Sequence, residues 1–253
     1  MQNDRQKMSI SCRPGDAGVL VRFWTTDHVR PEPVLWTESE WTKLVYAAEG
    51  ALLLTLDQER HLLPANRALL LGPGQRHQTR TTSRARIRTL FFAPSLAIPG
   101  RPGAFEVRPL FRELIREPCR VGPLMEANEI QAALARKLVS EAAAAPEDSF
   151  SLKMPLAEWA AEWAEAFLAD PAEARSPACS RRTLERTILR ETGLTLGEWS
   201  RQARMMTGVR LLTEGAPVQE AAMAAGYRTV GGFIQSHRRF FGRTPGRRLQ
   251  NSD

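Results

Sequence analysis

The stretch from Pro217 to Gly246, PVQEAAMAAGYRTVGGFIQSHRRFFGRTPG, is the most informative part of the chain. It predicts a short helix, a Gly-Tyr turn, an N-cap at Thr229 and a second helix that carries Arg238 and Arg239. A Gly-x-Thr-Pro stop follows, because glycine favours the end of a helix and proline cannot continue one. This order of elements is the layout of a helix-turn-helix, which places its second helix in the major groove of DNA.

A second arginine-rich helix is predicted upstream, in SRRTLERTILRETG from Ser180 to Gly193. Ser180 is a good N-cap and Gly193 a natural residue after the helix end. Leu184 and Ile188 lie four residues apart and face inward. A connecting helix over 199–212 then leads to the second unit. The outer face of the first helix carries Arg182, Glu185 and Arg186.

The net positive charge is confined to the C-terminal part of the chain. Residues 175–253 contain fourteen arginines, no lysine and six acidic residues, a balance of +8; the whole chain carries +7, so the first 174 residues sit near −1. A basic surface attracts a polyanion, because neutralising phosphates releases condensed counterions. Arginine also hydrogen-bonds phosphate or guanine with two parallel donors. The alternative is a solvated cationic surface without a partner.

Length and composition are those of an ordinary globular protein with room for two domains: 253 residues, 43% hydrophobic and 25% charged. The sequence has no run of eighteen apolar residues, and its first residues lack the apolar core of a signal peptide, so we expect a cytoplasmic protein with no membrane contact. Three widely spaced cysteines without a C-x-x-C motif argue against a disulfide framework and against a zinc site.

The first part of the chain, residues 17–92, is predicted to be β-rich, because short apolar runs alternate with turn residues. These runs cover 43–47, 51–56, 68–71 and 85–92. In the last of them Arg86 and Arg88 alternate with smaller residues, which is typical of a strand with one wet face. Close spacing of short strands favours a sandwich or a barrel.

Helical patterns follow the proline-rich segment 94–103, where we place the end of the β domain. One helix is predicted over 109–116 and another over 124–140, with a linker at 142–149 and an amphipathic helix over 156–169 that contains Trp159. The second of these helices would have one apolar stripe, which packs against the β domain or serves self-association. The stripe consists of Leu124, Ala127, Ile130, Leu134 and Leu138.

The pattern SRRTLER…ETGL…EW…QAR…LL.EG..V…A…GY.T…F….RR.FG.TP, from Ser180 to Arg247, resembles the DNA-binding domain of the AraC family of bacterial transcription regulators. The resemblance implies a β+α fold in two domains. Residues 1–105 would form a cupin-like β-barrel sensor, 106–150 a helical connector with a possible role in dimerisation, and 151–253 an all-α domain with two helix-turn-helix units. It also implies double-stranded DNA, a small-molecule effector, RNA polymerase and a second copy of the chain as partners.

Carried over position by position, the resemblance assigns DNA contacts to both recognition helices, about one helical turn of DNA, or 34 Å, apart. Arginine reads guanine, glutamate accepts from cytosine and glutamine reads adenine. The last two arginines of the second helix would lie closer to the phosphate backbone. The assigned residues are Arg182, Glu185 and Arg186 in the first helix, and Val230, Gly231, Gly232, Gln235, Arg238 and Arg239 in the second.

The chain departs from the family pattern at three places. Only AEARSPAC separates Asp170-Pro171 from Ser180, where the family has an additional helix, so the first unit is predicted to be truncated. Its inward apolar pair would then need cover from the helix that contains Trp159. Two glycines, Gly231 and Gly232, fall in the first turn of the second recognition helix, at a cost of up to about 1 kcal/mol each. His237 replaces a core phenylalanine and is expected to be a half-buried filler.

These observations predict a ligand-responsive, sequence-specific transcription regulator and no enzyme. One alternative is a cupin-type metal-dependent enzyme, but the segment that would supply paired histidines has none, and His28, His61 and His77 are isolated. We therefore expect no catalytic residue, cofactor or metal, and His77 is expected to complete a strand end. The other alternative is a degenerate regulator that binds DNA without sequence preference.

Overall fold

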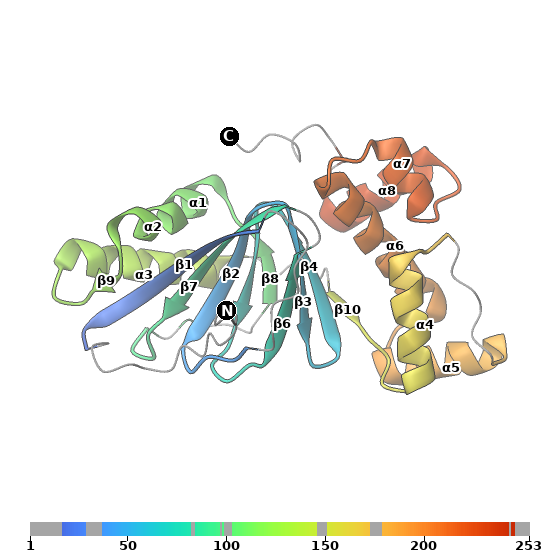
Figure 1. Cartoon of the computed structure of the whole chain (residues 1–253), viewed down its shortest axis with the longest axis horizontal. Helices are drawn as coiled ribbons and strands as arrows, with labels where there is room; N and C mark the ends of the chain where they lie inside the picture. Colours follow the sequence, from blue (N-terminus) through green and yellow to red (C-terminus); the bar gives the residue numbers. More distant parts are fainter. Residues whose placement is uncertain are drawn as a thin grey trace, which may run out of the picture. The chain divides into compact units, whose positions relative to one another are not determined.

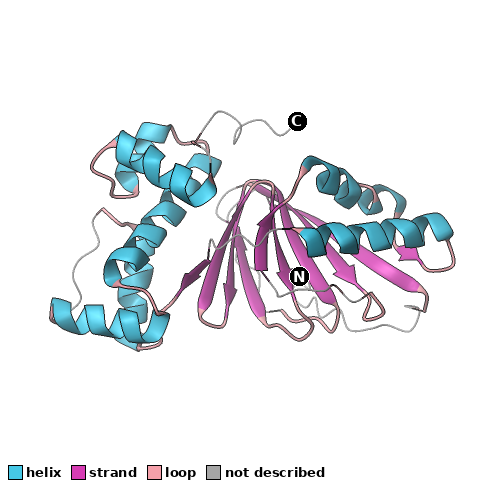
Figure 2. Cartoon of the chain, turned by 180° about the vertical axis from the view of Figure 1, so that it is seen from behind, coloured by secondary structure: helices cyan, strands magenta, loops and turns pink. Residues whose placement is uncertain are grey.

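The computed structural model describes residues 17–28, 37–81, 84–96, 98, 103–145, 151–172, 179–242 and 244–245. The chain divides into two compact units, Met1–Asp57 with Leu63–Ser149, and Gln58–Leu62 with Phe150–Asp253. We call them the N-terminal and the C-terminal unit. Strands dominate the first and helices the second (Figures 1 and 2). Within the described residues, no helix is both long and apolar enough to cross a membrane.

The strands form two antiparallel sheets, in the orders β8-β5-β2-β7-β1-β9 and β10-β4-β3-β6. The predicted order, a β-rich part followed by a helical part, is confirmed, and the described strands form two sheets. All four predicted runs are strands. The bounds are β1 Val19–His28, β2 Thr42–Glu49, β3 Ala51–Leu56, β4 Glu59–Pro64, β5 Arg67–Leu71, β6 His77–Thr81, β7 Ala85–Phe92, β8 Gly103–Glu106, β9 Leu124–Met125 and β10 Ser151–Lys153.

Alternation along the strands separates two apolar layers of the N-terminal unit. Ala85 and Ile87 of β7 lie in a core cluster with leucines of both sheets, which is therefore the layer between the sheets. Leu90 and Phe92 lie on the opposite face of the same sheet, in a second cluster with the helices. The predicted alternation in β7 is confirmed, because Arg86 and Arg88 are only partly buried. Strand β8 shows that the β structure continues beyond the proline-rich segment.

Three helices, α1 (Pro109–Arg116), α2 (Pro118–Val121) and α3 (Glu129–Ala144), belong to the N-terminal unit. The predicted helix over 109–116 is confirmed, whereas the one over 124–140 is wrong at both ends. Asn128 starts α3 by accepting from the backbone N–H groups of Ile130 and Gln131, both at 3.1 Å. Leu124 instead pairs with β1, and the helix extends into the predicted linker.

The apolar face of α3 differs from the predicted stripe for the same reason. Moving the helix start to Glu129 leaves Ile130 82% exposed. The buried positions are Ala132, Ala135, Leu138 and Ala142, which share one cluster with the sheet. The helix thus packs on the β structure, which is the first of the two uses considered for the stripe.

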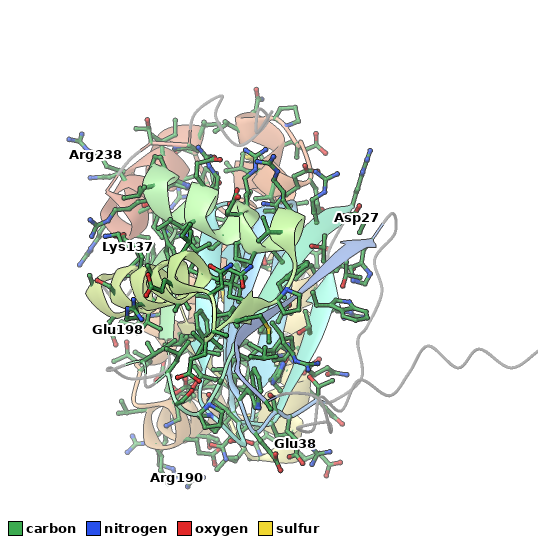
Figure 3. All side chains as sticks on the ribbon, turned by 90° about the vertical axis from the view of Figure 1, so that its left-hand side faces the viewer. Asp27, Glu38, Lys137, Arg190, Glu198 and Arg238 are labelled. Atoms are coloured by element: carbon green, nitrogen blue, oxygen red, sulfur yellow. The ribbon has the colours of Figure 1, made fainter. Side chains whose placement is uncertain are left out.

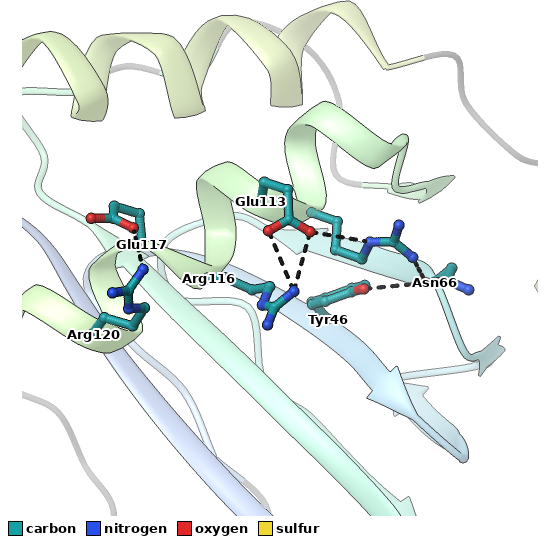
Figure 4. Close-up of polar contacts among 7 residues, drawn as sticks. Tyr46, Asn66, Glu113, Arg116, Glu117 and Arg120 are labelled. Carbon is teal, nitrogen blue, oxygen red and sulfur yellow. Dashed lines mark hydrogen bonds and ion pairs between the residues drawn. The ribbon is translucent and has the colours of Figure 1, made fainter. Parts of the chain in front are cut away.

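A small polar network holds α1 over the sheet (Figure 4). Tyr46, buried on β2, donates to Asn66 Oδ1 at 3.3 Å, and Arg112 Nη1 of α1 donates to the same oxygen at 3.4 Å. Asn66 occupies a left-handed turn with φ of 68°, a conformation that asparagine tolerates better than most residues. Burial raises the pKa of the Tyr46 phenol, so the hydroxyl remains a donor at neutral pH.

The C-terminal unit contains five helices among its described residues: α4 Glu158–Ala169, α5 Arg181–Thr192, α6 Leu196–Thr213, α7 Val218–Ala224 and α8 Val230–Phe241. All five predicted helices are confirmed. Between α4 and α5 the described residues 170–172 and 179–180 form no helix. Residues 58–62 and strand β10 complete the unit, where Met154 N donates to Gln58 O at 2.6 Å and Arg60 forms an ion pair with Glu165 of α4.

Candidate nucleic-acid interface

Helix α5, the predicted first recognition helix, has the predicted ends and the predicted buried face. Ser180 Oγ accepts from Thr183 N at 3.2 Å, and Gly193 closes the helix with φ of 75°. Leu184 and Ile188 are 5% and 0% exposed. Helices α4 and α6 both contact α5. Trp159 itself remains 36% exposed, and the tryptophan of α4 that turns inward is Trp163.

An aromatic cluster joins α4 to α6. Trp199 of α6 is fully buried, and its ring lies 5.2 Å from that of Trp163 and 5.7 Å from that of Phe167, between centroids. Its Nε1–H donates to the backbone oxygen of Lys153 at 2.9 Å. Tilted and edge-on aromatic pairs at these distances add to the stabilisation from burial. The cluster fixes the two helices on which α5 rests.

Glu191, near the end of α5, supplies the cap that the start of α4 lacks. Helix α4 begins after Ala157, whose side chain cannot accept a hydrogen bond. The Glu191 carboxylate instead accepts from the backbone N–H groups of Leu156 at 2.8 Å and Ala157 at 2.9 Å. The hydrogen bond from Ala157, followed by the one from Arg190, lowers the pKa of Glu191 below its usual value. This carboxylate therefore ties the start of α4 to α5.

Replacing Glu191 by alanine is expected to lower the free energy of unfolding by about 1 kcal/mol, the usual cost of losing a helix cap. Because the folded-state pKa of Glu191 is lowered, its contribution is present above the pKa of the unfolded carboxyl group and is lost as the pH falls through the folded value. Urea unfolding of both proteins at pH 7 and in acid checks this. Glu185→Ala, an exposed acid on the same helix, is the matched control; an equal loss there would contradict the capping role.

The second unit also has the predicted layout. Thr229 Oγ1 accepts from Gly232 N at 3.1 Å and starts α8. The turn before it is made by Gly226, with φ of 76°. Tyr227 donates to Ser236 Oγ at 3.1 Å and its ring lies edge-on to the fully buried Phe233. These contacts lock α8 against α7 and α6.

The side chain of His237 lies on the buried face of α8. It is 5% exposed, so it is buried rather than half-buried as expected. Its ring lies 4.6 Å from that of Phe241 and 6.1 Å from that of Phe233, between centroids. The histidine occupies the place of a core aromatic and does not belong to the exposed surface of the helix.

Most residues assigned to DNA contact by the resemblance are solvent-accessible on the two helices. On α5, Glu185 forms an ion pair with Arg181, 2.9 Å from Nε to Oε1, so its carboxylate already has one partner. Figure 3 shows Arg238 projecting from the surface. Exposed are Arg182, Glu185, Arg186, Gly231, Gln235, Arg238 and Arg239, while Val230 and Gly232 are partly buried.

Further exposed residues, which the resemblance did not assign to DNA contact, lie on the same helices or next to them. Arg181 lies one turn before Glu185, a spacing of four that could have been read from the sequence. Arg228 is exposed immediately before the N-cap of α8. Leu189 on α5 and Met223 on α7 are 51% and 55% exposed, which no helical pattern had marked. This surface is therefore basic, and two exposed apolar side chains, Leu189 and Met223, lie among its charged residues.

Helix α6 sets the spacing between the two recognition helices. Both α5 and α8 contact it, and they lie towards its opposite ends (Figures 1 and 2). Its 18 residues correspond to an axis of about 27 Å at 1.5 Å per residue. That length is of the order of one turn of the DNA double helix. A Cβ built on Gly231 would meet no atom within 4 Å, so the start of α8 offers a backbone surface free of neighbouring groups.

The histidines considered for a metal site lie in the N-terminal unit and in the adjoining strand β4. Among the described residues, no group of three or more histidine, cysteine or acidic side chains is placed to hold a metal ion. His77 starts β6, and its Nδ1 lies 3.1 Å from the backbone oxygen of Gln75, as expected for a residue that completes a strand end.

Comparisons with known proteins find similarity to a domain model, to a regulator and to solved structures. A model described as a helix-turn-helix domain matches residues 174–251. The HTH-type transcriptional regulator NimR of Escherichia coli (strain K12) is 28% identical over 224 residues, which cover 81% of this chain and 78% of that regulator. A crystal structure of ToxT from Vibrio cholerae matches with a TM-score of 0.37 and 11% identity over 90% of this chain and 96% of that chain. A cupin superfamily protein from Desulfitobacterium hafniense matches 36% of this chain and 82% of its own, with a TM-score of 0.29 and 16% identity.

The fold, the two capped recognition helices and the matching domain model define a helix-turn-helix protein with a β-rich N-terminal part. Over 81% of its length the chain is similar to NimR, an HTH-type transcriptional regulator.

Proposed function

We propose that this regulator binds double-stranded DNA at specific sites and that a small molecule held by the N-terminal unit changes this binding. The observation that carries the first part is the pair of arginine-bearing helices, α5 and α8, attached to one connecting helix of about 27 Å. Two helices, α5 and α8, held by one connecting helix, can enter successive segments of the major groove on one face of the duplex.

The two helices have different means of reading DNA. On α5, Arg182 and Arg186 can each donate two hydrogen bonds to guanine, whereas Glu185 must share its carboxylate with Arg181. On α8, Gln235 suits adenine, and the glycine-rich first turn lets the backbone approach the duplex closely. Arg238 and Arg239 contact phosphates. The first helix therefore reads by hydrogen bonds and the second reads shape to a larger extent.

The truncated first unit is compatible with this function. Its apolar pair is buried, and α4 and α6 both contact α5. We propose the division of labour that the resemblance implies, with 1–105 as the sensor, 106–150 as the connector and 151–253 as the DNA-binding domain. Contact with RNA polymerase and dimerisation remain predictions.

Binding of the full chain to a library of duplexes at two salt concentrations tests the proposal. We expect a sequence-dependent preference that persists when salt weakens the phosphate contribution. Gln235→Ala and Arg186→Ala should each reduce the affinity for the preferred site roughly 10-fold and relax the preference at one base pair, as expected for losing a base contact.

Arg120→Ala is the matched control, because this exposed arginine lies in the N-terminal unit and pairs only with Glu117 among the ion pairs of the described residues. It should leave the preference unchanged. Uniform binding to all duplexes by the unaltered protein would favour the degenerate regulator instead. A preference that survives both substitutions would contradict the assigned roles.

A further inference from the structure

Arg88 is a cation on β7, an inner strand of the larger sheet. In register it lies opposite Tyr46 of β2 and opposite Thr25 of β1. Ile87, the residue before it, belongs to the layer between the sheets, and Leu90, two residues after it, belongs to the cluster with the helices. Because side chains alternate along a strand, the Arg88 side chain lies on the helix side of the sheet.

The charge of Arg88 is not balanced by a neighbouring acid. Arg86, two residues earlier on the same face, pairs with Glu49 at 2.7 Å and with Asp27 at 3.1 Å. Arg88 forms no hydrogen bond or ion pair with any residue that the structure describes, and its Nε is buried without a partner. The residue as a whole is only partly buried, so solvent reaches its outer part. A partly desolvated guanidinium without a counter-ion is unfavourable unless an anion binds it.

Two further arginines, Arg112 and Arg116 of α1, lie near the same place (Figure 4). Arg112 Nη1 donates to Asn66 Oδ1 at 3.4 Å, and the same oxygen accepts from the Tyr46 hydroxyl. Arg116 follows Arg112 by four residues, so it lies on the same side of α1. Burial raises the pKa of the Tyr46 phenol, and the positive charges of Arg112, Arg88 and Arg116 oppose this shift. All three guanidinium groups are therefore close to one hydroxyl.

Arg88, Arg112 and Arg116, which we call the arginine cluster, carry more charge than their neighbour Glu113 neutralises. The Glu113 Oε1 atom lies 3.8 Å from Arg112 Nε, and both carboxylate oxygens accept from Arg116 Nη1 at 3.3 Å. Three positive charges and one negative charge leave a balance of +2. The side chains of Arg112 and Arg116 are 39% and 52% exposed, so a ligand can reach the arginine cluster from solvent.

We propose that the arginine cluster binds a phosphate group, either as the free ion or as part of a small phosphorylated molecule. A phosphate monoester carries about −1.5 to −2 charges at pH 7, which matches the balance of +2, and it offers three strong acceptor oxygens. Guanidinium groups bind such oxygens with two parallel N–H donors. The bound phosphate would connect α1 with β7 through Arg112 and Arg88. This inference goes beyond the proposed function, since it requires no change in DNA binding.

Calorimetric titration of the full chain with inorganic phosphate and with glycerol 3-phosphate tests the inference, with acetate and glycerol as comparisons. At a salt concentration of about 0.15 M, long-range attraction to other basic surfaces is screened. We expect at least one phosphate to bind, acetate to bind roughly tenfold more weakly and glycerol not to bind. Binding of the free ion alone would identify inorganic phosphate as the ligand, whereas tighter binding of the ester would identify a phosphorylated molecule.

Arg88→Met and Arg116→Met should each weaken phosphate binding roughly tenfold, the usual effect of losing a hydrogen bond to a charged group. Without ligand, the midpoint of thermal unfolding of Arg88→Met should equal that of the unaltered protein or exceed it, because a partly desolvated charge is removed. Arg120→Met, which changes an exposed arginine of α2 paired with Glu117, is the matched control. Arg186→Ala tests whether phosphate binds to α5 instead. Neither control should change phosphate binding.

Three results would overturn the inference: neither phosphate binds, acetate or glycerol binds as well as the phosphates, or Arg88→Met binds phosphate unchanged. A lower thermal midpoint for Arg88→Met without ligand would also count against it, since the guanidinium would then have a structural role. DNA binding of Arg88→Met without phosphate should equal that of the unaltered protein. Failure of the proposed function would appear in that DNA assay, whereas failure of this inference appears in the titration alone.

Discussion

Replacing Trp199 by alanine is expected to lower the free energy of unfolding by about 4 kcal/mol, a typical cost for removing a buried tryptophan. The side chain is fully buried and its ring contacts those of Trp163 and Phe167. The substitution also leaves the Lys153 carbonyl without its donor at 2.9 Å. Urea unfolding followed by far-ultraviolet circular dichroism measures the change. We expect DNA binding to fall with it, because α4 and α6 support the first recognition helix.

Two further variants separate the contributions to this loss. Trp199→Phe keeps an aromatic ring but loses the Nε1–H donor, so an intermediate loss of about 2 kcal/mol is expected. Trp159→Ala removes a tryptophan that is 36% exposed on the neighbouring helix and should cost clearly less than Trp199→Ala. Equal losses for Trp159→Ala and Trp199→Ala would show that the cluster does not support the unit as inferred.

Gly208→Ala is expected to lower the free energy of unfolding by about 1 to 2 kcal/mol, although alanine favours a helix by about 1 kcal/mol over glycine. A Cβ at this position would lie 2.5 Å from Cε2 and 3.0 Å from Cζ of Phe233. That ring is fully buried and belongs to the second recognition helix. The ring must therefore shift, and α8 with it. Chemical unfolding and the duplex library measure the two consequences, a loss of stability and a weaker site preference.

Gly197→Ala provides the control within the same helix. A Cβ there would meet no atom within 4 Å, so only the gain in helix propensity, up to about 1 kcal/mol, is expected. Opposite signs for the two glycine substitutions would support the close packing of α6 against α8. If Gly208→Ala were as stable as Gly197→Ala, the interface could accommodate a methyl group and the inferred constraint would be wrong.

Local signals predicted the helices of the C-terminal unit well. Ser180, Thr229 and Gly193 act as caps through contacts with residues at most four positions away, so their roles are visible in the linear sequence. The same reasoning misplaced the start of α3, because an apolar residue at a helical spacing can equally belong to a strand. Leu124 is such a residue, and its pairing with β1 spans about a hundred positions.

The sequence could predict which residues belong to the candidate site, but not the contacts that hold the helices on which they lie. Helical periodicity places Arg182 and Arg186 on the outer side of α5, and both are exposed. The contacts that hold α5 come instead from elsewhere in the chain. Glu191 caps a different helix, and Trp199 bonds to a strand, so neither role has a local signature.

The sequence alone therefore determined the β-rich first part, the helices of the C-terminal unit with their capped ends, and the basic charge of the C-terminal part, since each depends on neighbours in the chain or on overall charge. Tertiary structure alone decided which distant groups meet: the placement of Lys43 next to His77, the cap of α4 by Glu191 and the contact between Gly208 and Phe233. The physical reason is that periodicity and capping act over a few residues, whereas burial and desolvation depend on chain segments that only folding brings together.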